Sequence, residues 1–235
     1  MIALARDCLN DVTRRTPSST LPLLLGHRGA RANKSIPENT LASFDQALAD
    51  SCDGFEFDVR MTADGEAVIC HDPKVGAVEI ARSKQSALTG LPRLDRVLKR
   101  YRRSAFLDIE LKVAGLEKQV AELLRRYRIR RGYVVSSFLP GVLRNLHIED
   151  PYMPLGLICE TRRQLGRWQE LPVEYLIVRY SIASQKLIRE IHDAGKKIFV
   201  WTVNDKAIAR KFADWGVDGI ISDDTRMLKR SLPGI

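Results

Sequence analysis

Residues 23–48, LLLGHRGARANKSIPENTLASFDQAL, contain a short apolar run, a polar loop and a helical pattern in succession. The apolar run ends at His27 and Arg28, and a glycine follows directly. Apolar residues then recur from Leu41 to Leu48 at the spacing that places them on one stripe of a helix. The stretch therefore predicts a strand that ends on ionisable side chains and leads through a loop into a helix.

The same alternation continues along the chain. Short apolar runs bounded by turn residues predict strands at residues 22–27, 54–59, 67–71, 105–111, 132–138, 154–159, 175–179, 197–203 and 217–222. Helical patterns lie between most of them, at residues 38–51, 116–128, 184–194 and 205–215, and weaker ones at 92–101, 140–147 and 161–170. Repeated strand–helix units predict a parallel sheet covered by helices, and both a closed (β/α)8 barrel and an open doubly wound sheet satisfy this pattern.

One strand-like run is surplus to an eight-stranded barrel. It arises in 61-MTADGEAVICHD-72, where no helix separates two runs and Asp64-Gly65 indicates a tight turn. The pattern does not tell which of the two runs is the excursion. Because no repeat, linker or low-complexity segment divides the chain, we predict one domain over residues 22–235, after a polar N-terminal leader at residues 1–21.

The composition is that of a globular protein, with 45% hydrophobic and 29% charged residues among 235. No apolar run approaches the roughly 18–20 residues that a membrane helix needs. Arg6 and Asp7 interrupt the apolar start, so we expect no signal peptide. The four cysteines form no CxxC pair, which favours neither a zinc site nor a disulfide framework. We therefore expect a cytoplasmic protein.

Ionisable side chains gather where the predicted strands end. They are His27, Arg28, Glu56, Asp58, His71, Asp72, Asp108, Glu110 and Lys112. Because residues two apart share one face of a strand, each of the pairs 56/58 and 108/110 points the same way, and apolar neighbours take the other face. In a barrel these carboxylates would meet in one narrow mouth and repel one another unless a cation lies between them. Hard oxygen ligands suit Mg²⁺, Ca²⁺ or Mn²⁺.

The remaining side chains at these strand ends suit a phosphate. Arg28 can grip phosphate oxygens with its planar fork, and Lys112 can do so as a point charge. His27 and His71 can exchange protons near neutral pH. A divalent cation, two phosphate-binding cations and two imidazoles together indicate cleavage of a phosphodiester.

The order and spacing of these motifs resemble the glycerophosphodiester phosphodiesterase family. The resemblance covers residues 24 to 224 and rests on HRGA, PENT, GFEFDVRMTADGEAVICHD, LDIELK, VWTVN and GVDGIISDD. It implies a TIM-type (β/α)8 barrel with a short insertion after the third strand-like run. It also implies metal-dependent hydrolysis of glycerophosphodiesters to glycerol 3-phosphate and an alcohol.

The resemblance also assigns site residues. It implies metal binding by Glu56, Asp58 and Glu110, acid–base catalysis by His27 and His71, and phosphate binding by Arg28 and Lys112. Glu38 of PENT lies near the site in the family pattern, and Trp201 is a candidate wall of the substrate pocket. The insertion here, DPKVGAVEIARSKQSALTG, is shorter than in many members, so a bulkier lysophospholipid is an alternative substrate.

Plainer interpretations stand beside these. Residues 38–40 follow a proline and could serve only to cap a helix, as could Asn204-Asp205 and Asp223-Asp224. Asp108 is expected to support the site rather than bind metal, and Asp72 to orient the loop after His71. A catalytically silent barrel that binds a phosphate ligand is the alternative to an enzyme.

Lys and Arg exceed Asp and Glu by 38 − 29, a net charge of +9, which suggests an anionic partner. The basic runs 99-KRYRRS-104 and 125-RRYRIRRG-132 fall at predicted helix ends, which is the bottom of a barrel, opposite the site. Cations are favourable there in any case. A solvated face is the default interpretation of these runs, and contact with an anionic membrane surface is the minor functional alternative. We expect no nucleic-acid partner, because no motif supports one.

Overall fold

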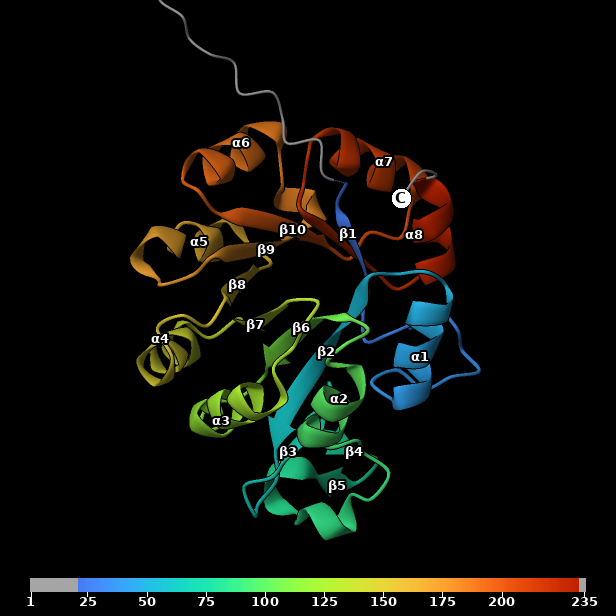
Figure 1. Ribbon diagram of the computed structural model, residues 1–235, viewed down its shortest axis with the longest axis vertical. Helices are drawn as coiled ribbons and strands as arrows, with labels where there is room; N and C mark the ends of the chain where they lie inside the picture. The colour runs from blue at the N-terminus through green and yellow to red at the C-terminus, as the bar shows by residue number, and fades with distance from the viewer. Residues whose placement is uncertain (1–20, 233–235) are drawn as a thin grey trace, which may run out of the picture.

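Eight parallel strands close into a barrel in the computed structural model, which describes residues 21–232 (Figure 1). The barrel strands are β1 (Leu23–Gly26), β2 (Gly54–Met61), β6 (Phe106–Leu111), β7 (Tyr133–Ser137), β8 (Leu155–Cys159), β9 (Tyr175–Arg179), β10 (Lys197–Trp201) and β11 (Gly219–Ser222). β1 pairs with both β11 and β2, which closes the sheet. The structure therefore confirms the barrel over the open sheet. The predicted leader lies, apart from Leu21, outside the described residues.

The surplus run is β3 (Ala67–Ile69), which is no part of the parallel barrel. β3 pairs antiparallel with the end of β2, and the turn between them contains Gly65 at a φ of +79°. The chain thus passes the mouth of the barrel on β2 and returns on β3. A small excursion follows, made of β4 (Lys74–Val75), β5 (Val78–Glu79), η1 (Ile80–Arg82) and η2 (Gln85–Ala87).

Helices cover the outside of the barrel (Figure 1). They are α1 (Leu41–Ala49), α2 (Leu94–Tyr101), α3 (Glu117–Tyr127), α4 (Pro140–Glu149), α5 (Arg162–Leu165), α6 (Gln185–Asp193), α7 (Lys206–Asp214) and α8 (Thr225–Ser231), with 3-10 turns η3 (Trp168–Glu170) and η4 (Tyr180–Ile182). Helix α8 was not predicted from the sequence, because its seven residues are mostly polar and show no long apolar stripe. Within residues 21–232, no helix has both the length and the apolar content that crossing a bilayer requires.

Alternation along the strands divides the core into two parts. Phe55 and Phe57 of β2 point outward and pack with Phe44 of α1, whose ring stacks on that of Phe55 at 4.3 Å between centroids. Inside the barrel lies a separate apolar cluster of Leu25, Phe106, Val134, Ile158, Tyr175, Ile177, Phe199 and Ile221. This cluster fills the lower barrel, so only the mouth remains for polar side chains.

We expect Phe44→Ala to lower the free energy of unfolding by about 3–5 kcal/mol, because the ring is fully buried against β2 and its loss leaves a cavity. Urea denaturation would measure the change. Tyr152→Ala is the matched control: its side chain is 95% exposed, so its effect should stay within about 0.5 kcal/mol. Equal stability of the two variants would contradict this account of the core.

Candidate active site

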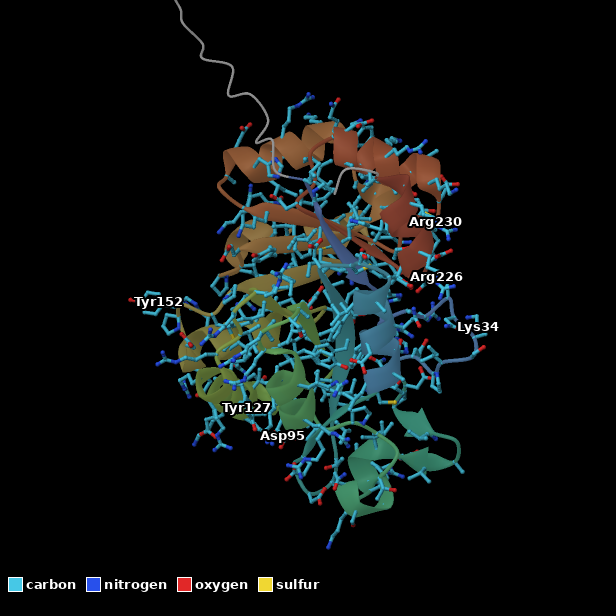
Figure 2. The ribbon with its side chains drawn as sticks, turned by 45° about the vertical axis from the view of Figure 1, so that its right-hand side comes forward. Lys34, Asp95, Tyr127, Tyr152, Arg226 and Arg230 are labelled. Atoms are coloured by element: carbon cyan, nitrogen blue, oxygen red, sulfur yellow. The ribbon has the colours of Figure 1, made fainter. Side chains whose placement is uncertain are left out.

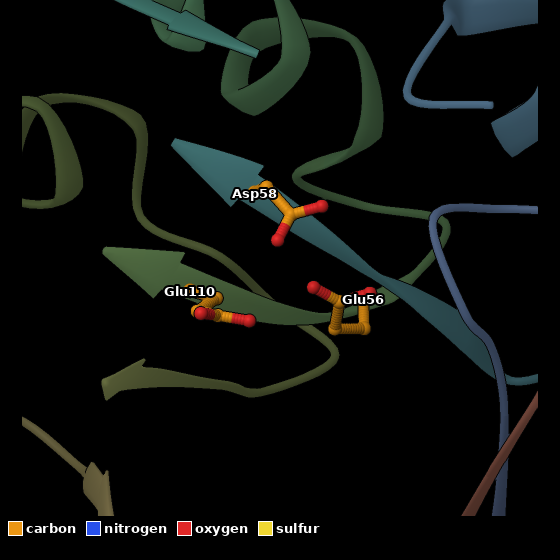
Figure 3. A group of neighbouring side chains, drawn as sticks. All are labelled: Glu56, Asp58 and Glu110. Atoms are coloured by element: carbon orange, nitrogen blue, oxygen red, sulfur yellow. The ribbon is translucent and has the colours of Figure 1, made fainter. Parts of the chain in front are cut away.

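Three carboxylates from two neighbouring strands meet at the mouth of the barrel. In the parallel register of β2 and β6, Glu56 lies beside Asp108 and Asp58 beside Glu110. Glu56, Asp58 and Glu110 each offer an oxygen within 4.8 Å of the other two, and all three side chains are buried. Figure 3 shows the three turned toward a common space from the two strands. The convergence predicted from alternation is thus present.

The pKa values of these carboxyls diverge. Burial raises the pKa of Glu56 well above its usual range, and the charges of Asp58 and Glu110 raise it further. Burial and the charge of Asp58 raise the pKa of Glu110 to about 7. Burial also acts to raise the pKa of Asp58, but attraction to Lys112 and Arg28, each 3.2 Å away, outweighs it and lowers that pKa. The cluster therefore holds one carboxylate firmly ionised and favours a proton or a cation at the others.

Unpartnered oxygens show that a cation fits this cluster. Oε1 of Glu56 and Oδ2 of Asp108 are buried without any hydrogen-bond donor. Oδ1 of Asp108 accepts a hydrogen bond from Ser136 at 2.6 Å, so Asp108 is held beside the trio. Buried carboxylate oxygens without donors are costly unless a proton or a cation neutralises them. The donor set contains only oxygen, which suits a hard divalent ion.

The loop after β1 is held in place by contacts of Arg28 and Gly29. Arg28 adopts a left-handed conformation with a φ of +53°, and its backbone N–H donates to Glu56 at 3.0 Å. The hydroxyl of Ser43 in α1 donates to the Arg28 carbonyl at 2.9 Å. Gly29 follows at a φ of +80°, and a Cβ there would overlap the backbone of Ser43. The loop is therefore fastened both to the helix and to the carboxylate cluster.

His27 is oriented by the carboxylate of Asp223, for which the local sequence indicates only a helix cap. Nδ1 of His27 lies 2.7 Å from Asp223, in the loop after β11. Asp223 also accepts hydrogen bonds from Arg31 at 3.2 Å and Asn204 at 2.7 Å. Burial acts to raise the pKa of Asp223, but these partners, His27 first among them, lower it. Since the carboxylate accepts at Nδ1, Nε2 is left free, and it lies 3.9 Å from Glu56.

Asp224, the neighbour, caps α8 by accepting from the backbone N–H of Met227, and Asp205 caps α7 in the same way. The cap interpretation therefore holds for Asp224 and Asp205 and fails for Asp223 and Asn204. Nothing in the local pattern SDD distinguishes the two aspartates, because the partner of Asp223 lies 196 residues away along the chain.

The second histidine, His71, reaches the mouth just after the returning strand β3 of the hairpin. The backbone N–H of Cys70 donates to the Asp58 carbonyl at 3.0 Å, which brings the next residue, His71, beside β2. Nδ1 of His71 lies 2.7 Å from Asp72, and the His71 carbonyl accepts from Arg60 at 2.7 Å. Asp72 thus holds the imidazole itself. Unlike Asp223, its side chain is largely exposed.

The segment Glu38-Asn39-Thr40 does more than cap a helix. Thr40 caps α1 as expected. Asn39 instead donates from its side chain to Asp58 at 2.8 Å, and Glu38 accepts from Arg28 at 2.7 Å. The segment therefore supports both the carboxylate cluster and Arg28. The sequence does not reveal this role, because the same residue types are common in helix caps.

The mouth opens into a cavity of about 240 Å³. Its polar side is formed by His27, Arg28, Glu56, His71, Asp108, Glu110, Lys112 and Glu160. Its apolar side includes Phe138 and Trp201, whose rings meet edge to face at 5.8 Å between centroids. Trp201 is fixed by a hydrogen bond from its indole N–H to the Ile177 carbonyl at 3.1 Å. Glu38 lies apart from this lining, in an adjoining groove.

A model of the glycerophosphoryl diester phosphodiesterase family matches residues 27–105 and 106–227. The chain belongs to this family. The family consists of phosphoric diester hydrolases, and the match covers the barrel strands from β2 to β11 and every predicted site residue. The motif-based resemblance is thereby confirmed.

Relatives and solved structures agree with the family. The glycerophosphodiester phosphodiesterase of Caldanaerobacter subterraneus is 27% identical, with 88% of this chain and 96% of that protein covered. A crystal structure of the Thermotoga maritima glycerophosphodiester phosphodiesterase matches with a TM-score of 0.77 at 25% identity, covering 91% and 99%. An Oleispira antarctica phosphodiesterase, solved with its product sn-glycerol-3-phosphate, matches in fold with a TM-score of 0.78 at 24% identity, covering 90% and 96%.

We expect the metal-free phosphodiesterase to lose stability as pH rises from about 4.5 to 7. Burial raises the pKa of Asp108 and of Glu110 to about 7 in the folded protein, above their ordinary values. The folded state therefore binds more protons than the unfolded chain in this window, and deprotonation favours unfolding. Carboxyls with lowered pKa, such as Asp58, act only at lower pH. Thermal unfolding followed across this pH range in chelator would measure the slope.

Asp108→Asn is the control for this prediction, because it keeps the shape of the side chain and removes one of the two titrations. The slope should become shallower in this variant. Added Mg²⁺ or Ca²⁺ should raise the melting temperature most at the upper end of the window, where the carboxylates are ionised. A melting temperature that rises with pH in the metal-free protein would contradict the burial argument.

Proposed function

We propose that this family member hydrolyses glycerophosphodiesters to glycerol 3-phosphate and an alcohol, with a divalent cation at Glu56, Asp58 and Glu110. The observation that carries the proposal is the common cavity. Two imidazoles, each with its Nδ1 against a carboxylate, line the same cavity as two of these three carboxylates, and the third adjoins them. The names of the relatives and the product in the Oleispira structure support the same substrate class.

Phosphate binding falls to Arg28 and Lys112. Lys112 contacts Glu110 at 2.6 Å and Asp58 at 3.2 Å, and Arg28 contacts Asp58 at 3.2 Å. Both cations are half-buried at the cavity, and burial lowers but nearby carboxylates raise the pKa of each, with a net rise. A bound Mg²⁺, Ca²⁺ or Mn²⁺ would add positive charge that stabilises the charge building at phosphorus. Because the pKa values of Arg28 and Lys112 are raised, both side chains remain cationic and can neutralise phosphate oxygens at any physiological pH.

Proton transfer falls to His27 and His71. Asp223 and Asp72 each accept at Nδ1, so the free Nε2 atoms are the ones that exchange protons. One imidazole takes the proton of the attacking hydroxyl, which belongs either to water or to the glycerol of the substrate. The other, as imidazolium, gives a proton to the leaving alkoxide. Alkoxides leave poorly, so this assistance should contribute roughly 10²–10⁴ in rate.

We place this activity in the cytoplasm. The described cysteines, Cys52, Cys70 and Cys159, carry free thiols. Free thiols are the rule in a reducing compartment.

Product analysis with glycerophosphocholine tests the proposal. We expect glycerol 3-phosphate and choline to form, a chelator to abolish the reaction, and Mg²⁺ or Ca²⁺ to restore it. His71→Ala should lose at least about 10²-fold in kcat even with metal restored, because the leaving group or nucleophile loses its proton partner.

His147→Ala is the matched control, since His147 lies on α4, away from the cavity. It should keep full activity, and both variants should unfold at the temperature of the unmodified protein. Normal turnover by a folded His71→Ala protein, or indifference to chelator, would refute the mechanism. Absence of turnover with every diester would leave the silent phosphate-binding barrel as the correct interpretation.

A groove beside His71 favours a second candidate, a lysophospholipase D-like activity at the same site. The groove has a volume of about 490 Å³ and is lined by His71 and by residues of the β4–β5 hairpin. Its walls are largely apolar and include Val75, Val78, Leu88 and Leu91. His71 lines both the cavity and the groove, so the two adjoin. The acyl chain of a diester bound in the cavity could therefore extend into the groove.

We expect Val78→Asp to lower kcat/KM for monomeric lysophosphatidylcholine by about 10-fold or more, because the new charge faces an apolar chain. The value for glycerophosphocholine should not change. Ile148→Asp, a substitution of an exposed apolar residue on α4, is the control and should alter neither. Equal losses for both substrates, or no loss for either, would remove the groove from substrate binding.

A further inference from the structure

Seven arginines form a basic surface at the end of the barrel opposite the candidate site. This surface, the arginine face, consists of Arg102, Arg103, Arg125, Arg126, Arg128, Arg130 and Arg131. They belong to the C-terminal ends of α2 and α3 and to the loops that lead into β6 and β7. Those loops precede strands, whereas the cavity lies where the strands end. The function proposed above uses none of these residues.

The fold brings the two basic runs together. The backbone N–H of Arg130 donates to the Arg102 carbonyl at 2.7 Å, which joins the two loops directly. α2 and α3 also pack side by side. Among residues 21–232, none of the seven forms an ion pair with a carboxylate, whereas neighbouring Arg100 pairs with Asp45 at 2.8 Å. The arginine face therefore keeps most of its positive charge for an external anion.

Two exposed apolar side chains border the arginine face. Ile148 near the end of α4 is 77% exposed, and Tyr152 in the following loop is 95% exposed. The guanidinium of Arg125 donates to the Glu149 carbonyl at 3.4 Å, which places this loop beside the arginines. Figure 2 shows Tyr152 projecting from the molecule. The loop therefore offers an aromatic and an aliphatic side chain next to a group of cations.

We propose that the arginine face, together with Ile148 and Tyr152, docks the protein on an anionic lipid bilayer. Guanidinium forks pair with lipid phosphates, and clustered cations are drawn to the negative surface of such a bilayer. Tyrosine prefers the headgroup region, and an exposed isoleucine gains by entering the acyl boundary. Nucleic acid would also attract the arginines, but it offers no favourable environment for Ile148. The lipid surface accounts for both parts.

This docking leaves the catalytic end free. Because the arginine face and the cavity lie at opposite ends of the barrel strands, the mouth faces water when the arginines face lipid. A soluble diester could then enter unhindered. The proposal stands independently of the function assigned to the site.

Vesicle co-sedimentation of the full chain tests the proposal. We expect binding to vesicles of phosphatidylcholine enriched in phosphatidylglycerol, weakened by salt, and little binding to phosphatidylcholine alone. The combined variant R126E, R130E and R131E should lose affinity by about 100-fold or more, since each basic residue near the surface contributes several-fold. The variant K186E, R189E and K206E alters the net charge equally on α6 and α7 and should keep most of the affinity.

A second variant distinguishes lipid from other polyanions. Replacing Ile148 and Tyr152 by serine leaves the charge unchanged and should weaken vesicle binding roughly 10-fold, with no effect on binding to an RNA oligonucleotide. Both residues are exposed, so the fold should persist, as circular dichroism would show. The proposal is overturned if the two charge variants bind vesicles equally, or if RNA binds tightly while anionic vesicles do not.

Discussion

The need to neutralise buried carboxylates governs the upper half of this barrel. The parallel register of β2 and β6 places four acidic side chains in adjacent interior positions, where burial and mutual repulsion oppose their ionisation. Arg28 and Lys112 stabilise Asp58 from two sides, and the remaining oxygens suit a divalent ion. The same arrangement that makes the metal-free fold costly suits the binding of a divalent cation.

The two histidines reach this cluster by different structural routes. His27 directly follows barrel strand β1 and is held by Asp223, a half-buried carboxylate that has two further partners. His71 lies just after the antiparallel strand β3, outside the barrel, and is held by the exposed Asp72. The first imidazole is thus set rigidly by the closure of the barrel between β1 and β11. The second imidazole depends on the β2–β3 hairpin, whose end, at Ile69 and Cys70, also lines the apolar groove.

Much of the architecture could be predicted from the sequence. Local periodicity predicts the strand–helix alternation. It also predicts the inward direction of Glu56 and Asp58 and the apolar outer face of β2, because successive side chains of a strand point to opposite faces. The family motifs predicted that the site residues lie at one end of the barrel. In the structure, nearly all of them line one cavity. Helix α8 was missed because its stabilisation comes from neighbours rather than from its own pattern.

Composition, periodicity and motif order by themselves determined the class of fold and the family. Only the tertiary structure decided that the surplus run is the antiparallel β3, that Asp223 serves His27 while Asp224 caps a helix, and that Asn39 braces Asp58. Each of these depends on a contact between segments far apart in the chain. Such contacts give no signal in the local sequence pattern, because the partner residues come close together only when the barrel closes.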